Sequence, residues 1–193
     1  MNQSGLLFAF GILIAGFVLQ TFVIWPVESS FRQDDLVDMV SFVFVPHGLK
    51  VLVFMMFGVV VFPVVFLAQF INGIMYSGDI ATSVISALAG SICVAVPILL
   101  LNLSLDKKVM AAPLFDTTTT LNMFWTLMSV SCVSSLINEI MHTAIYGFPV
   151  DGLAFLYLIG DISGAIVVCL ILLMFSKLIT ARIRGAEVKN DQS

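Results

Sequence analysis

The chain has 193 residues, 60% of them apolar, with only 8 Lys and Arg and 12 Asp and Glu, and its mean hydropathy is +1.12. This apolar surface exceeds what one water-soluble core can bury, so the composition predicts an all-α, polytopic membrane helix bundle. At about 20 apolar residues per crossing, the length allows five or six spans in a single domain and excludes an added soluble catalytic domain. A net charge of -4 without any basic run excludes nucleic acid as a partner.

Apolar segments follow one another along the whole chain. The first, Leu6–Trp25, holds no charge and ends in Trp25-Pro26, an aromatic interface anchor followed by a residue that stops helices. The run Leu36–Tyr76 is too long for one crossing, and Gly58 divides it into two helices, the first interrupted at Pro46–Gly48. The expected spans are 6–25, 36–57, 59–76, 80–103, 121–145 and 153–177, followed by a basic and then polar tail over 178–193.

Basic residues predict the orientation, because Lys and Arg near span ends are held on the cytoplasmic side. With six spans and both termini inside, every basic residue of the links and tail is cytoplasmic except Arg32. In the alternative with five spans, Leu36–Val45 lies at the surface, the N-terminus is outside and Arg32 is inside. We favour six spans in the plasma (inner) membrane, because the long apolar run is hard to hide otherwise.

Ionisable groups at membrane depth are costly unless they are paired or hydrated, so each one is a functional hypothesis. Glu139 and Asp161 lie six and eight residues from the outer ends of their helices, at nearly matching depths. Asn138, Glu139 and His142 share one broad helix face, and His47 lies near mid-membrane at the proline-glycine break. The sequence predicts an outward-facing polar pocket lined by these five residues. The alternative is a network of hydrogen bonds that only fixes helix packing.

Lys50 follows His47 by three residues and leaves two interpretations open. Its ammonium reaches the cytoplasmic interface at the end of its four-carbon stem, or it forms a buried ion pair with Asp161 or Glu139.

Motifs of soluble enzymes are absent from the sequence. It contains no HExxH, P-loop, GxGxxG or nucleophile elbow, and two histidines with two acids form no ligand motif. We therefore expect no enzyme, no metal and no cofactor.

Three short segments carry a family resemblance: Val45-Pro46-His47-Gly48-Leu49 opening an apolar helix, the stretch from Phe57-Gly58 to Pro63, and Leu158-Ile159-Gly160-Asp161-Ile162-Ser163-Gly164. Over Phe42–Phe175 the chain resembles the MASE1 family, the integral membrane sensory domain of bacterial histidine kinases and diguanylate cyclases. The positions that match the family pattern are Pro46, Gly48, Gly160, Asp161 and Gly164. His47 stands where the family usually has a small residue.

The resemblance implies a ligand- or signal-sensing module, and with no output domain after Ser193 such a module needs a separate membrane or cytoplasmic protein partner. A second hypothesis is the substrate-binding subunit of a small-molecule uptake transporter, because six spans in about 190 residues resemble those subunits of energy-coupling-factor transporters. A third is a structural or assembly subunit of a membrane complex. The lipid bilayer surrounds the chain in all three, and the first two add a small-molecule ligand.

Overall fold

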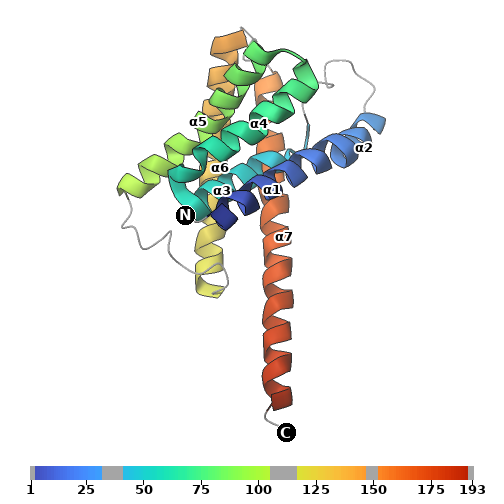
Figure 1. Cartoon of the computed structure of the whole chain (residues 1–193), viewed down its shortest axis with the longest axis vertical. Coiled ribbons are helices and arrows are strands. Elements are labelled where there is room, and N and C mark those ends of the chain that lie inside the picture. Colours follow the sequence, from blue (N-terminus) through green and yellow to red (C-terminus); the bar gives the residue numbers. More distant parts are fainter. Residues whose placement is uncertain (1–2, 32–40, 105–116, 147–151, 191–193) are drawn as a thin grey trace.

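The computed structural model describes residues 3–31, 41–104, 117–146 and 152–190, and the regular elements in these ranges are helices (Figure 1). Five of these helices are long and apolar enough to cross a membrane: Gln3–Ser30, Val45–Ser77, Ile80–Leu101, Phe124–Ile145 and Phe155–Phe175. The predicted all-α membrane bundle is confirmed at this level. The links at 32–40, 105–116 and 147–151 and residues 191–193 lie outside the described residues.

The sequence predicted that the first membrane helix ends at Trp25-Pro26, and this prediction is wrong. It runs on through α1 (Gln3–Leu19), a π-helical turn (Gln20–Ile24) and α2 (Trp25–Ser30). Proline lacks an N–H and its ring clashes with the carbonyl four residues back in a regular helix. Here the Trp25 N–H bonds to the carbonyl of Gln20, five residues back, so the wider turn precedes Pro26 and the helix continues.

The second helix, α3, spans Val45–Phe57, so its predicted start at Leu36 is wrong for the part that is described: Ser41–Phe44 are not helical. A proline costs nothing in the first turn of a helix, where its missing N–H has no partner anyway, and Pro46 lies there. At 13 residues, α3 is about 20 Å long and cannot by itself cross an apolar layer of about 30 Å. It is a half-span.

A glycine ends α3 where the sequence predicted a division. Gly58 has φ 67, a region that other residues rarely adopt. A short 3₁₀ turn (Gly58–Val61) then leads into α4 (Phe62–Ser77), whose first turn contains Pro63.

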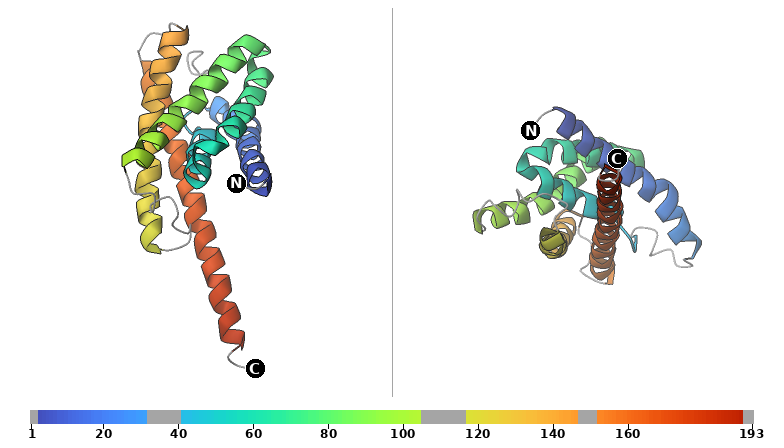
Figure 2. Two further views of the ribbon diagram at one scale, coloured as in Figure 1. Left: turned by 60° about the vertical axis from the view of Figure 1, so that its left-hand side comes forward. Right: turned by 90° about the horizontal axis from the view of Figure 1, so that it is seen from below.

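The remaining helices are α5 (Ile80–Ser104), α6 (Thr117–Tyr146) and α7 (Gly152–Asn190), which contain the predicted spans. Thr117–Thr120 form the first turn of α6. At 39 residues, α7 is about 58 Å long, far beyond its predicted end at Lys177. Figures 1 and 2 show its C-terminal part projecting alone from the bundle.

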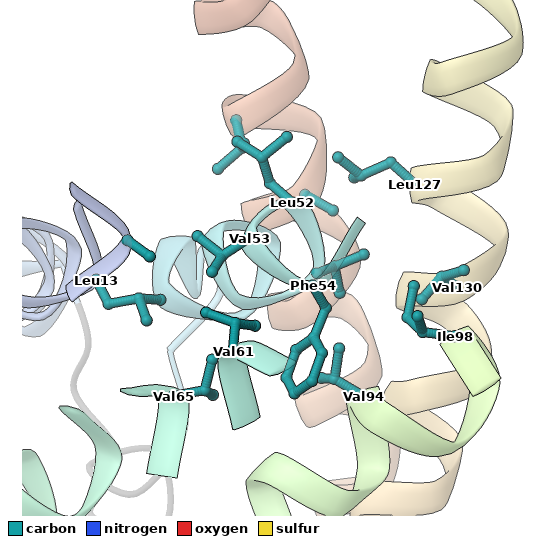
Figure 3. Close-up of a cluster of buried hydrophobic side chains, with 14 of the residues drawn as sticks. Leu13, Leu52, Val53, Phe54, Val61, Val65, Val94, Ile98, Leu127 and Val130 are labelled. Carbon is teal, nitrogen blue, oxygen red and sulfur yellow. The ribbon is translucent and has the colours of Figure 1, made fainter. Parts of the chain in front are cut away.

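The short helix α3 lies at the centre of the bundle and is contacted by α1, α5, α6 and α7. Its apolar side chains, among them Phe54, join Leu13, Val65, Ile98 and Leu127 in a common core (Figure 3). Nine of its 13 residues are buried, including His47 and Lys50. Central placement therefore puts two polar side chains inside the protein rather than against lipid.

Asp79 immediately precedes α5, in the link after α4, and provides a pH-dependent prediction. Its carboxylate accepts the backbone N–H of Thr82 at 2.7 Å, and hydrogen bonds from the Thr82 side chain and backbone lower the pKa of Asp79 from 3.8. A lowered pKa means that the ionised form stabilises the fold at neutral pH, and that this contribution is lost as the pH falls through the lowered value. Asp79→Ala is expected to lower Tm by about 2 °C at pH 7 and by less at pH 3. Thermal unfolding in detergent at both pH values tests this, and an equal difference at both would contradict it.

Candidate functional site

The non-helical segment Ser41–Phe44 is held by the carboxylate of Glu28. Glu28 Oε2 accepts the backbone N–H of Phe42 at 3.2 Å, and Oε1 accepts that of Val43 at 2.9 Å. Ser41 Oγ donates to the same carboxylate at 2.7 Å. Glu28 therefore satisfies backbone donors that have no helical hydrogen bond to make.

The next two backbone donors also have partners. Phe44 N–H donates to the carbonyl of Gly160 on α7 at 2.8 Å, and Val45 N–H donates to Gln20 Oε1 at 3.2 Å. Gln20 lies in the π-helical turn and is 3% exposed, so its amide belongs to the interior. The start of α3 is thus tied to both α1 and α7.

Three glycines allow this segment to lie directly on α7. A Cβ at Gly160 would collide with the carbonyl of Ser41, and one at Gly164 with the carbonyl of Phe44. At Gly48 a Cβ would come within 2.7 Å of the Ala165 Cα. Three positions of the family resemblance therefore share one physical role, which is close backbone contact between the start of α3 and α7.

His47 joins three helices in the interior. It is 1% exposed, its Nε2 lies 2.9 Å from Ser134 Oγ on α6, and its Nδ1 lies 3.2 Å from Asp161 Oδ2 on α7. The latter two atoms are close enough for an ion pair but are not aligned as a hydrogen bond. The order Ser-His-Asp resembles a hydrolase triad, but Ser134 is 0% exposed and does not line the cavity described next, so the chain of contacts holds helices together.

A cavity of about 240 Å³ lies beside this contact, between the membrane helices. Its lining contains five charged or amide side chains: Lys50, Gln69, Asn72, Asn138 and Asp161. Four aromatic side chains complete much of the wall: Phe17, Trp25, Phe44 and Tyr157. A small concave site with a few convergent polar groups among aromatic side chains is the usual form of a ligand-binding pocket.

Lys50 supplies the positive charge of the cavity. It is 3% exposed, its Nζ donates to Gln69 Oε1 at 3.2 Å, and it lies 6.0 Å from the centre of the Phe44 ring. Gln69 is oriented by its own Nε2, which donates to Ser91 Oγ at 2.9 Å. The interpretation that Lys50 extends to the cytoplasmic interface is therefore wrong for this structure, and within the described part of the chain its ammonium forms no direct ion pair with an acid.

Two acceptors line the same cavity from α6 and α7. Asp161 is 3% exposed, and its Oδ2 has no hydrogen-bond partner among the described residues. The buried Oδ1 of Asn138 likewise has none there. Lys50 is an electrostatic neighbour of Asp161 without touching it. The cavity thus has the Lys50 donor on one side and, on the other, the free Asn138 Oδ1 and the Asp161 carboxylate, whose Oδ2 is 3.2 Å from His47 Nδ1.

The structure brings together only part of the predicted pocket. Asn138 and Asp161 line the cavity, while His47 contacts Asp161 without lining it. Glu139 is half-buried, and it is not among the side chains that line this cavity. The side chain of His142 lies outside the described residues.

Three contributors were missed from the sequence: Gln20, Glu28 and Ser134. Ser134 belongs to a stripe on α6 with Ser131, Ser135 and Asn138, spaced three, four and seven residues from Ser131. This helical spacing predicts one polar face, and the three serines are indeed buried. Gln20 had a weaker signal, an amide inside an uncharged apolar run.

Comparison of the chain with known protein families, with curated proteins and with solved structures gives no match, so the resemblance to the MASE1 family stays a prediction.

Proposed function

We propose that this chain is an integral membrane ligand-sensing module, in which the cavity binds a small molecule and α7 carries the response to a separate partner protein. The observation that carries the proposal is the continuity of α7. Asp161 lines the cavity, and the same helix continues for 29 residues to Asn190, about 44 Å further on. A ligand that contacts Asp161 therefore acts on the same rigid element that projects from the bundle.

The contact between α7 and the start of α3 favours a small sliding movement. It is made by backbone against glycine, without interlocking side chains at Gly160 and Gly164. Helix shifts of about 1–2 Å are a common form of signal transmission in proteins. A ligand produces such a shift when it binds one position of the helix more tightly than the other.

We further propose six passes with both termini cytoplasmic, in which Ser41–Phe44 and α3 together form the second pass. In Figure 1 the start of α1 lies lower than the end of α2, and α7 projects downward from the bundle, which favours this arrangement. The projecting part also contains basic residues, which favour the cytoplasmic side: Lys177, Arg182, Arg184 and Lys189.

The cavity then opens toward the outer side. Three of its lining residues, Trp25, Asn72 and Tyr157, each lie five residues from the end of a helix that this topology places outside: Ser30, Ser77 and Gly152. Small molecules from outside the cell would reach it there.

Native mass spectrometry of the full chain, released from detergent, tests the proposal. We expect the wild type to retain a small molecule and the double variant Lys50→Met/Asp161→Asn to lose it, because both charged walls of the cavity are then neutral. Retention of the same molecule by wild type and double variant would contradict the cavity as its site. A wild-type spectrum without any bound molecule would contradict ligand sensing itself.

A second candidate is a substrate-binding subunit of an uptake transporter. It is favoured by the non-helical segment Ser41–Phe44 before α3, which lies at the cavity, since interrupted helices commonly form substrate sites in transporters. Liposomes that contain the chain and its cytoplasmic partner separate the two functions: a transporter accumulates the retained molecule in the lumen, whereas a sensor leaves it outside.

A further inference from the structure

We infer that the cavity binds a free amino acid, a small zwitterion with a primary ammonium group at one end and a carboxylate at the other. This inference rests on the proposed function and names the class of ligand. It follows from the two buried charges, from the buried acceptors, and from the size of the cavity.

The carboxylate end is matched by Lys50. An ammonium has three N–H donors, and the described residues take up one of them, through Gln69. The remaining donors belong to a side chain that lines the cavity and is 3% exposed, so bulk water does not solvate them. A buried cation of this kind is strongly stabilised by an anion placed against it.

The ammonium end is matched by Asp161 and Asn138. Asn138 Oδ1 and Asp161 Oδ2 are buried acceptors of side chains that line the cavity. Within the described ranges Asn138 Oδ1 has no hydrogen-bond partner, and Asp161 Oδ2 has only the unaligned contact with His47 Nδ1 at 3.2 Å. A primary ammonium donates to two such acceptors at once. A quaternary ammonium, as in betaine, has no N–H and would donate to neither.

A ligand with a single charge fits less well than a zwitterion. A simple carboxylate satisfies Lys50 but faces the negative charge of Asp161, and a simple amine satisfies Asp161 but faces Lys50. Only a molecule with both charges places a carboxylate against Lys50 and an ammonium against Asp161. The paired acidic and basic walls therefore select against singly charged molecules as well as for zwitterions.

The size of the cavity supports a small member of this class. A cavity of about 150 Å³ holds one benzene molecule, so about 240 Å³ holds a molecule of amino-acid size but not a peptide or nucleotide. Aromatic side chains such as Trp25 and Tyr157 offer apolar contact to the carbon atoms between or beside the charged groups.

Thermal unfolding of the full chain in detergent, with a thiol-reactive dye, tests the inference. Cys93 and Cys169 are free and buried, so their reaction reports unfolding. The probes are L-alanine, β-alanine and γ-aminobutyrate, which differ in the separation of their charges, against propionate, propylamine and glycine betaine. We expect at least one of the three amino acids at saturation to raise Tm by about 5 °C, and the other three compounds to leave it unchanged.

Variants locate the effect in the cavity. Lys50→Met and Asp161→Asn are each expected to weaken binding of the active amino acid by about 30-fold or more, because each removes one partner of a desolvated charge. Glu139→Gln is the comparison variant: it neutralises an acid that is an electrostatic neighbour of Asp161 but does not line the cavity, and we expect it to weaken binding far less than Lys50→Met or Asp161→Asn. If the single variants fold poorly, the double variant Lys50→Met/Asp161→Asn, with no unpaired charge, tests the same loss.

The inference is overturned if none of the three amino acids raises Tm, if propionate, propylamine or betaine raises it equally, or if the double variant still responds. The native mass spectrum distinguishes failure of this inference from failure of the proposed function. A molecule retained in the native mass spectrum without an amine or a carboxylate overturns the amino acid and keeps ligand sensing. A spectrum without any retained molecule, together with no response to any probe, overturns both.

Discussion

Gly164→Ala is expected to lower the free energy of unfolding by on the order of 3 kcal/mol, the upper end of what overpacking costs. The new methyl group would collide with the carbonyl of Phe44 and approach the nitrogen of Val45. Neither atom belongs to a flexible side chain, so α7 and the start of α3 must separate, and the Phe44–Gly160 hydrogen bond weakens with them. Unfolding by sodium dodecyl sulfate, followed by circular dichroism in mixed micelles, measures the change.

Gly11→Ala provides the matched control. Gly11 also lies inside a membrane helix, but a Cβ there has no neighbouring atom within 4 Å. Alanine favours a helix over glycine, so this variant is expected to be neutral or slightly more stable. If Gly164→Ala unfolds no more readily than Gly11→Ala, the close contact between Ser41–Phe44 and α7 is not formed in the membrane protein.

Lys50→Met and Asp161→Asn are each expected to destabilise the fold by on the order of 3 kcal/mol, because each leaves the other charge buried without its counter-charge. The double variant is expected to cost clearly less than the sum of the two. The same detergent titration gives all three values, and the difference is the interaction energy of the pair.

Glu139→Gln is the comparison variant for these stability measurements, because it removes a negative charge that does not line the cavity. Glu139 is half-buried, and its carboxylate accepts only a long hydrogen bond from Thr143, at 3.5 Å, among the contacts within the described chain. Its neutralisation is expected to change stability little. Additive costs for Lys50→Met and Asp161→Asn, or an equally large cost for Glu139→Gln, would show that Lys50 and Asp161 do not act across one cavity.

The prolines of this chain predict helix boundaries correctly in some places and not in others. Pro46 and Pro63 lie in first turns, where their fixed φ and missing N–H are tolerated. Pro26 also lies in a first turn, but only because a π-helical turn precedes it. The residue types in Gln20–Ile24 do not predict that turn. The helix end predicted at Trp25 failed for this reason.

Depth and direction must be distinguished at the candidate site. Asn138 and Glu139 are neighbours on α6 and nearly equal in depth, yet they point about 100° apart around the helix, and Asn138 is the one that lines the cavity. Depth follows from counting residues to a helix end. Direction depends on how α6 turns against α3 and α7, which the sequence near Glu139 does not specify.

The sequence by itself determined the membrane class, the helical architecture, the division at Gly58 and the interior position of Asp161, because the cost of placing polar or charged groups in lipid is local and can be counted along the chain. Only the tertiary structure decided that Lys50 is an interior residue and that Glu28 and Gln20 satisfy backbone donors at the start of α3. It also decided that this backbone lies in close contact with Gly160 and Gly164 of α7. These contacts join residues up to 120 positions apart, between Ser41 or Phe44 and the glycines of α7. Their partners are chosen by packing, in which the rotation of each helix depends on all its neighbours.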